Sequence, residues 1–151
     1  MIFVSVGSTR FDELVQAIDL IAPVLMEEVV VQIADGSYVP KNCGWFRYAE
    51  RLDEYLERAD LVIGHGGAGV TFEVLGLGKR LISVENPHAL EGHQADLLGK
   101  LAGEGHLVWC RDLRKLEQAI RYAKRADLKE YVRPACEIAR VIARWLGMPV
   151  E

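Results

Sequence analysis

The chain has few cysteines, and their spacing does not suggest a metal site. Its 151 residues include three cysteines, at positions 43, 110 and 136. They form no CxxC pair and are not spaced with histidine as zinc ligands usually are. Too few cysteines are present for a disulfide framework, so we expect a reduced, cytoplasmic protein. We also expect neither a metal nor another cofactor.

The sequence also lacks concentrated positive charge and long apolar runs. The formal net charge is -4 at pH 7, and no basic stripe or tract stands out against this acidic balance. Nucleic acid is therefore not an expected partner. No apolar run approaches the ~20 residues needed to span a membrane, so we expect no segment of the chain to insert into a bilayer.

Short apolar runs alternate with amphipathic segments along the whole chain. Strands are expected at residues 2–6, 29–34, 61–63, 81–84 and 107–110, with a further short strand within 38–48. Helices are expected at about 12–28, 52–59, 70–76, 93–102, 112–126 and 128–146. This alternation predicts a single α/β domain over residues 1–151, with a Rossmann-like parallel sheet of about six strands and helices on both faces.

Four residues are expected to shape the helices. Asp12 and Asp112 are placed to cap the helices that follow them. Pro23 should kink or shorten the first helix, and Pro134 interrupts the last one. The last helix has an apolar stripe that includes Val132, Ile138, Ile142 and Trp145. It is expected either to pack on the sheet or to extend to a partner.

Residues 60–78 have the pattern of a ligand-binding turn between a strand and a helix. The turn consists of Gly64, His65, Gly66, Gly67, Ala68 and Gly69. Glycine lets the backbone approach a ligand closely, and the free N–H groups that open a helix attract an anion such as phosphate. Glu73 follows about one helical turn later, where its carboxylate can reach a diol beside that phosphate. Together these features indicate a nucleotide site.

Two other interpretations of the turn remain open. Many α/β domains place glycines between strand and helix only to make the turn tight. The ending of the Walker loop is absent, but Gly64, Gly66 and Gly69 match the letters of the G-x-G-x-x-G dinucleotide motif. Glu85 follows Gly69 by ~16 residues, where an acid is expected at about 20. NAD binding is therefore an alternative.

Polar residues also begin the helix that follows the strand at 81–84. The loop at 85–92 leaves the carboxyl end of this strand, where ligands of open parallel sheets bind. His93 and Gln94 come next, at the helix start. They are either further ligand-binding residues or ordinary polar residues at a solvated helix terminus.

Three segments together resemble the family 28 glycosyltransferases. They are Val6–Thr9 before Phe11 and Asp12, then Asp60–Glu73, and then Gly92–Gln94. The resemblance extends over nearly the whole chain and corresponds to the carboxyl-terminal, donor-binding half of the two-domain GT-B fold. It is closest to the small catalytic subunits of two-subunit enzymes, both the eukaryotic subunit that adds GlcNAc to dolichol-linked oligosaccharide and bacterial exopolysaccharide counterparts.

The resemblance implies a UDP-sugar donor and a role for each matching residue. Gly67, Ala68 and Gly69 would hold the diphosphate, Glu73 the ribose, Gln94 and His93 the sugar, and Ser8 and Thr9 would line the cleft. His65 matches the family's histidine and would orient the loop, touch the donor or be purely structural. It is a possible catalytic residue, but the general base is expected on the half that this chain lacks. Val70 departs from the threonine of many relatives, which leaves one phosphate contact in question.

The missing half implies a partner. The resemblance points to a hexosyltransferase subunit, peripheral at the membrane through a membrane-anchored subunit that binds a lipid-linked saccharide acceptor. The final helix, with Trp145 and its arginines, is the candidate for docking that subunit. The competing hypothesis is a nucleotide-binding or scaffold module with no catalytic role.

Overall fold

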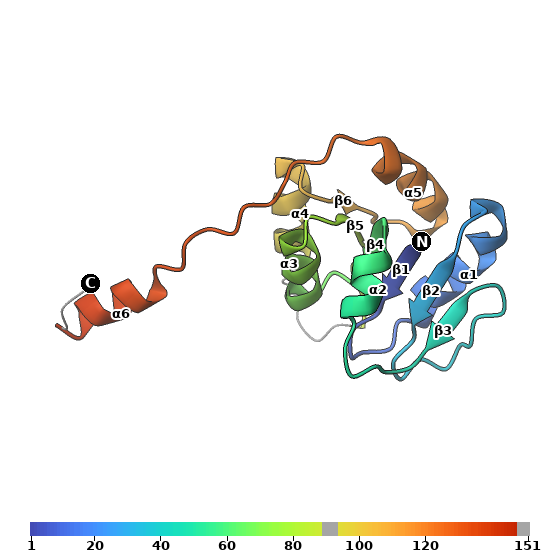
Figure 1. The fold of residues 1–151 in the computed structure, drawn as a ribbon, viewed down its shortest axis with the longest axis horizontal. Helices are drawn as coiled ribbons and strands as arrows, with labels where there is room; N and C mark the ends of the chain where they lie inside the picture. The colour runs from blue at the N-terminus through green and yellow to red at the C-terminus, as the bar shows by residue number, and fades with distance from the viewer. Residues whose placement is uncertain (89–93, 148–151) are drawn as a thin grey trace.

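A computed structural model describes residues 1–88 and 94–147 of the chain (Figure 1). The strands are β1 (Ile2–Ser5), β2 (Val29–Gln32), β3 (Gly44–Phe46), β4 (Leu61–Gly64), β5 (Arg80–Ser83) and β6 (Val108–Trp109). The α-helices are α1 (Asp12–Leu25), α2 (Asp53–Arg58), α3 (Ala68–Gly76), α4 (Gln94–Glu104), α5 (Leu116–Arg125) and α6 (Ile138–Trp145). A 3₁₀ turn, η1 (Leu113–Lys115), precedes α5.

The six strands form one parallel sheet, as the sequence predicts. Their order is β3-β2-β1-β4-β5-β6, and each neighbouring pair is parallel. In the centre, Ile2 of β1 pairs with Val29 of β2 on one side and with Leu61 of β4 on the other. The strand order reverses between β1 and β4, and ligands of such sheets bind at the carboxyl ends of the strands on either side of this reversal.

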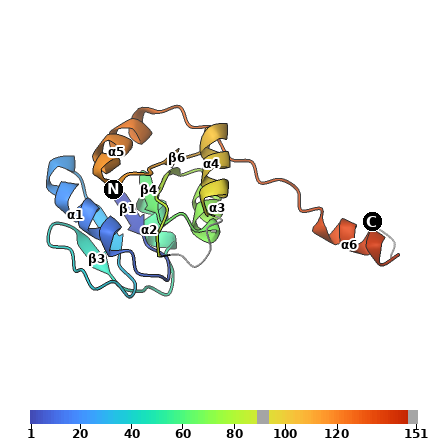
Figure 2. The same cartoon turned by 180° about the vertical axis from the view of Figure 1, so that it is seen from behind.

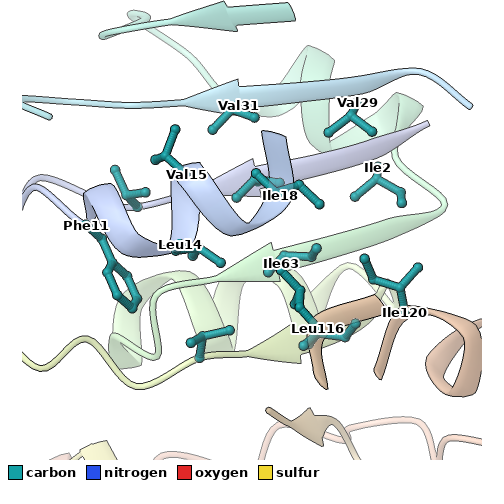
Figure 3. Packing of buried hydrophobic residues seen from close by; sticks show 14 of the residues in the cluster. Ile2, Phe11, Leu14, Val15, Ile18, Val29, Val31, Ile63, Leu116 and Ile120 are labelled. Carbon is teal, nitrogen blue, oxygen red and sulfur yellow. The ribbon is translucent and has the colours of Figure 1, made fainter. Parts of the chain in front are cut away.

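Helices cover both faces of the sheet. Helices α1 and α5 lie on one face, and α2, α3 and α4 lie on the other (Figures 1 and 2). Side chains of β1 alternate between them, because Ile2 and Val4 belong to the core under α1 and α5 whereas Phe3 belongs to the core under α2, α3 and α4. Figure 3 shows Leu14 and Ile18 of α1 packed over the sheet in the first of these cores.

Helix α1 begins and ends differently from the prediction. Phe11 is its N-cap residue, and Asp12 is the first helical residue. The Asp12 carboxylate instead accepts hydrogen bonds from the backbone N–H groups of Ser37 and Tyr38, at 3.1 and 3.2 Å, so the predicted cap was wrong. The helix accommodates Pro23 but ends at Leu25, three residues before the predicted end at 28. Asp112 does cap η1, since its carboxylate accepts from the N–H of Arg114.

The predicted helix over 128–146 was wrong in its first half. Residues 127–137 are not helical, and only α6 remains of it. Pro134 lacks an N–H group and disfavours helical backbone in the residue before it, so the helix begins only beyond it. Figure 1 shows α6 at the end of an extended arm, away from the sheet. The alternative in which this helix packs on the sheet is therefore incorrect.

A buried carboxylate fixes the segment between β2 and β3. Asp19 of α1 is 2% exposed and accepts hydrogen bonds from the Tyr38 hydroxyl at 2.7 Å and from the backbone N–H groups of Lys41 and Asn42 at 3.0 and 2.6 Å. Burial alone would raise the pKa of Asp19, but these hydrogen bonds outweigh it and hold the pKa below the ordinary 3.8. The segment is thus anchored to α1 by an ionised group.

We expect Asp19→Asn to lower the free energy of unfolding by about 2 kcal/mol, because an amide cannot accept all of these bonds and leaves buried donors unpaired. The pKa of Asp19 is lower folded than unfolded, so its contribution is present above about pH 4 and is lost as the pH falls through the folded value. Urea unfolding from pH 7 to pH 3 should therefore show the two proteins converging at low pH. A constant difference across that range would contradict this assignment.

Candidate functional site

The glycine-rich turn lies at the carboxyl end of β4, next to the strand-order reversal. Gly67 is the N-cap of α3 and has extended backbone. The first turn of the helix closes with the Thr71 N–H donating to the Gly67 carbonyl at 3.0 Å, so the N–H groups of Ala68, Gly69 and Val70 open the helix without partners inside it. A Cβ on Gly69 would meet no atom within 4 Å. The helix start is therefore open to a ligand.

His65 lies beneath this turn and holds two loops at a close distance. A Cβ on Gly7, in the β1–α1 loop, or on Gly67 would come within 3.0 Å of the imidazole ring. Gly7 also has a φ of +70°, which favours glycine. The ring thus packs directly against the backbone of both loops, and a larger residue at either position would displace them.

The His65 imidazole is partly buried. Burial lowers its pKa below the ordinary 6.5, so the ring is neutral at pH 7. Its Nδ1 is buried and has no hydrogen-bond partner among the described residues. Of the roles considered for His65, orienting the loop is the one for which the structure provides contacts, and its catalytic role stays a prediction.

Ser8 and Thr9 lie on the β1–α1 loop and are exposed. A buried polar pair supports this loop, because the Ser5 hydroxyl donates to Oε1 of Gln32 at 2.8 Å and Nε2 of Gln32 donates to the Gly7 carbonyl at 3.3 Å. Gln32 interrupts an otherwise apolar strand in the sequence, and this bond explains its presence. Ser8 and Thr9 are therefore presented beside the strand-order reversal.

Gln94 approaches the glycine turn from α4. Its Oε1 would lie 3.1 Å from a Cβ on Gly66, which has a φ of +81°. The same oxygen accepts a hydrogen bond from the backbone N–H of Asn86 at 3.3 Å. The structure thus brings Gln94 and the turn together, while its contact with the sugar stays a prediction. His93 lies outside the described residues.

Glu73 is exposed on α3, one turn beyond Gly69. Its side chain makes no hydrogen bond or ion pair within the described part of the chain, so its carboxylate is available to a ligand. Its predicted role toward a ribose stays a prediction, as do the ligand contacts of the other residues named above.

No sequence motif marks the residues that tie the β5–α4 loop to the β1–α1 loop and to α1. Asn86 is 3% exposed, and its Nδ2 donates to the Arg10 carbonyl at 3.3 Å. Nε2 of His88 lies 2.8 Å from Oε1 of Glu13. The Asn-Pro-His sequence at 86–88 indicates a turn, but no sequence pattern shows that this turn reaches across to the β1–α1 loop and to α1.

A hollow elsewhere on the domain has cationic walls but does not resemble a phosphate site. It has a volume of about 340 Å³, and Lys79, Arg80 and Tyr131 are among its lining residues. Lys79 donates to the Glu57 and Ala59 carbonyls, and Arg80 donates to those of Ala123 and Ala126. These cations already stabilise chain segments, so the glycine turn remains the better anion site.

Metal ligation and membrane spanning find no support in the part of the chain that the structure describes. Within residues 1–88 and 94–147, no three histidine, cysteine, aspartate or glutamate side chains gather to hold a metal ion. No helix in these ranges combines the length and apolarity needed to cross a bilayer.

The sheet order, with a helix start at its reversal, defines a Rossmann-like α/β domain. The model of the glycosyltransferase family 28 C-terminal domain matches residues 1–144. The chain therefore belongs to this family, which confirms the resemblance seen in the sequence.

Curated relatives include proteins named as subunits of a UDP-N-acetylglucosamine transferase. The chain is 38% identical over 121 residues to the UDP-N-acetylglucosamine transferase subunit ALG13 of Mus musculus, an alignment that includes 72% of this chain and 10% of that protein. It is 36% identical over 124 residues to the Homo sapiens protein of the same name, with 72% and 11% included. The chain thus spans about a tenth of the length of these relatives.

Solved structures share the fold. The solution structure of ALG13 aligns with a TM-score of 0.65 at 19% identity and includes 93% of each chain. The glycosyltransferase of kitacinnamycin gives 0.67 at 21% identity, over 83% of this chain and 34% of its own. The Streptomyces glycosyltransferase SsfS6, complexed with thymidine diphosphate, gives 0.62 at 26% identity, over 83% and 33%. These likenesses confirm the predicted α/β fold, which makes up about a third of the chain in the two solved glycosyltransferases.

Proposed function

We propose that this protein is the donor-binding catalytic subunit of a glycosyltransferase that moves GlcNAc or a related sugar from a UDP-sugar to a lipid-linked acceptor. The observation that supports it most is the approach of Gln94 to the glycine turn that opens α3 at the carboxyl end of β4, with Glu73 one turn further along the same helix. The choice of sugar follows the names of the relatives, which are UDP-N-acetylglucosamine transferase subunits. SsfS6 carries a nucleoside diphosphate, the leaving group that such a reaction releases.

The turn can assist departure of the diphosphate. When the bond between the sugar and the diphosphate breaks, the leaving oxygen gains negative charge. We propose that the N–H groups of Ala68, Gly69 and Val70, which open α3, and the positive end of its dipole face the place where that charge develops. In this proposal the protein's own donors stabilise the leaving group, and the reaction needs no metal.

The acceptor is bound elsewhere in this proposal. A GT-B enzyme closes two halves around its substrates, and this chain has the fold of one half. The subunit names of the relatives support a partner, and we propose that it is membrane-anchored, binds the lipid-linked saccharide and carries the general base. The protein would then be cytoplasmic and peripheral at the membrane through that partner.

Calorimetry with UDP, UDP-GlcNAc and NAD tests the donor assignment. We expect the wild-type chain to bind both uridine nucleotides, and Glu73→Ala to weaken each by ~10- to 100-fold, because two hydrogen bonds between a carboxylate and the ribose hydroxyls are lost. The same substitution should not change the affinity for 2′,3′-dideoxyuridine diphosphate, which lacks the ribose hydroxyls. An exposed glutamate on α2, Glu57, provides the matched control variant Glu57→Ala.

Each contrary result has a distinct meaning. Failure to bind any uridine nucleotide would favour the non-catalytic scaffold hypothesis. Preference for NAD would favour a dehydrogenase-like domain. Equal loss with the dideoxy nucleotide would show that Glu73 acts on another part of the ligand.

A further inference from the structure

We propose that Asn86 is a positioning residue, which orients Gln94 toward the sugar of the donor by tying the β5–α4 loop to the β1–α1 loop. This inference rests on the proposed function, because it deepens the role of the same site. Three hydrogen bonds of Asn86 carry it, together with the packing of Gln94 on the glycine turn.

The side chain of Asn86 joins two loops that are far apart in the sequence. Its Nδ2 donates to the Arg10 carbonyl at 3.3 Å, which fixes the β5–α4 loop to the segment that follows Ser8 and Thr9. Its Oδ1 accepts from the backbone N–H of His88 at 2.9 Å, which shapes the turn within its own loop. With only 3% of its surface exposed, Asn86 exchanges few of these bonds with water.

The backbone of Asn86 sets the orientation of the Gln94 amide. Its N–H donates to Oε1 of Gln94 at 3.3 Å, so the amide oxygen points into the loop. The NH₂ group of Gln94 is then left to donate to a ligand oxygen, such as a sugar hydroxyl. The same Oε1 lies against Gly66, so the position of Gln94 relative to the glycine turn is fixed.

A second tie between the same loop and α1 is weaker. The pair of His88 and Glu13 joins them at 2.8 Å, but both side chains are more than a third exposed. Exposed pairs of this kind contribute little. The buried amide is therefore the tie that decides where Gln94 lies, and His88→Gln serves as a control for it.

The test is calorimetry of UDP and UDP-GlcNAc with the full chain carrying Asn86→Asp. Aspartate keeps the acceptor for the His88 N–H, but it removes the donor to Arg10 and places a carboxylate against a carbonyl. We expect the affinity for UDP-GlcNAc to fall ~10-fold and that for UDP to change less than about twofold. Gln94→Ala should give the same pattern, and the double variant should lose no more than either single one.

The proposal is overturned if Asn86→Asp weakens UDP and UDP-GlcNAc equally, if it weakens neither, or if its effect adds fully to that of Gln94→Ala. His88→Gln should change both affinities less than about twofold, and a larger effect than that of Asn86→Asp would also overturn it. A wild-type chain that binds neither nucleotide would refute the proposed function itself, and this inference with it.

A second measurement applies even if the Asn86 variants do not fold. The side-chain amide resonances of Gln94 in the wild-type chain, assigned with Gln94→Ala, should shift on addition of UDP-GlcNAc and stay in place on addition of UDP. Identical shifts with both ligands would contradict the assignment of Gln94 and Asn86 to the sugar end of the site.

Discussion

Gly67→Ala is expected to reduce the affinity for UDP by ~100-fold or more. A Cβ at this position would come within 3.0 Å of the His65 ring, which also packs directly against Gly7. The ring has little room to retreat, so the backbone that opens α3 must move instead. Several N–H groups would then lose their alignment with the diphosphate at once. Calorimetric titration with UDP measures the effect.

Two further variants separate this cause from a general loss of stability. Gly103 lies within α4 and not at the start of a helix, and a Cβ there would meet no atom within 4 Å. Gly103→Ala should therefore leave UDP binding unchanged. Adding His65→Ala to Gly67→Ala removes the clash and should recover at least ~10-fold of the lost affinity. Normal UDP binding by Gly67→Ala would show that the diphosphate lies elsewhere.

Charged substitutions on the apolar face of α6 are expected to abolish transfer by the complete enzyme while leaving donor binding intact. Ile142 and Trp145 are 51% and 90% exposed, and Ile138 and Val141 extend the same apolar surface. A buried tryptophan at an interface commonly contributes more than about 2 kcal/mol. The double variant Ile142→Asp, Trp145→Asp should thus lower sugar transfer by ~100-fold or more at fixed subunit concentration.

The measurement is transfer from UDP-GlcNAc to a lipid-linked acceptor, with and without membranes that contain the partner subunit. We expect no transfer by the isolated chain, and transfer when the two are mixed. Arg140→Ala, on the polar side of α6, should have a much smaller effect. Full activity of the isolated chain would refute the two-subunit proposal, and undiminished activity of the double variant would place the docking surface elsewhere.

The sequence was sufficient to predict the sheet and the position of its ligand turn. Apolar runs such as 61–63 mark strands buried on both faces, and four glycines at one strand end mark a backbone that must approach something closely. Both signals come from residues close together in the sequence, so they can be recognised without knowing which distant segments pack against them. The parallel sheet of six strands and the α3 N-terminus therefore appear where they were expected.

The errors and omissions involve contacts between distant segments. Asp12 has the chemistry of a helix cap, but it meets the β2–β3 segment 25 residues away, and that contact takes its carboxylate. Asn86 contacts Arg10 across 76 residues. The apolar stripe predicted a helix interrupted at Pro134, because periodicity alone does not show that the segment before the proline is not helical at all. Contacts of this kind depend on which distant segments pack together, and a local sequence pattern does not contain that information.

The arm before α6 has a mechanical consequence. Lys129 donates to Gly105 and Tyr131 lies against Phe72, so the segment leaves the domain surface only near Val132. The residues from there to Glu137, if extended, span up to ~20 Å. A linker of that length would let the domain move away from the partner subunit and release the nucleotide product while α6 stays bound to that subunit. The domain could then bind a new donor molecule many times without α6 dissociating from the partner.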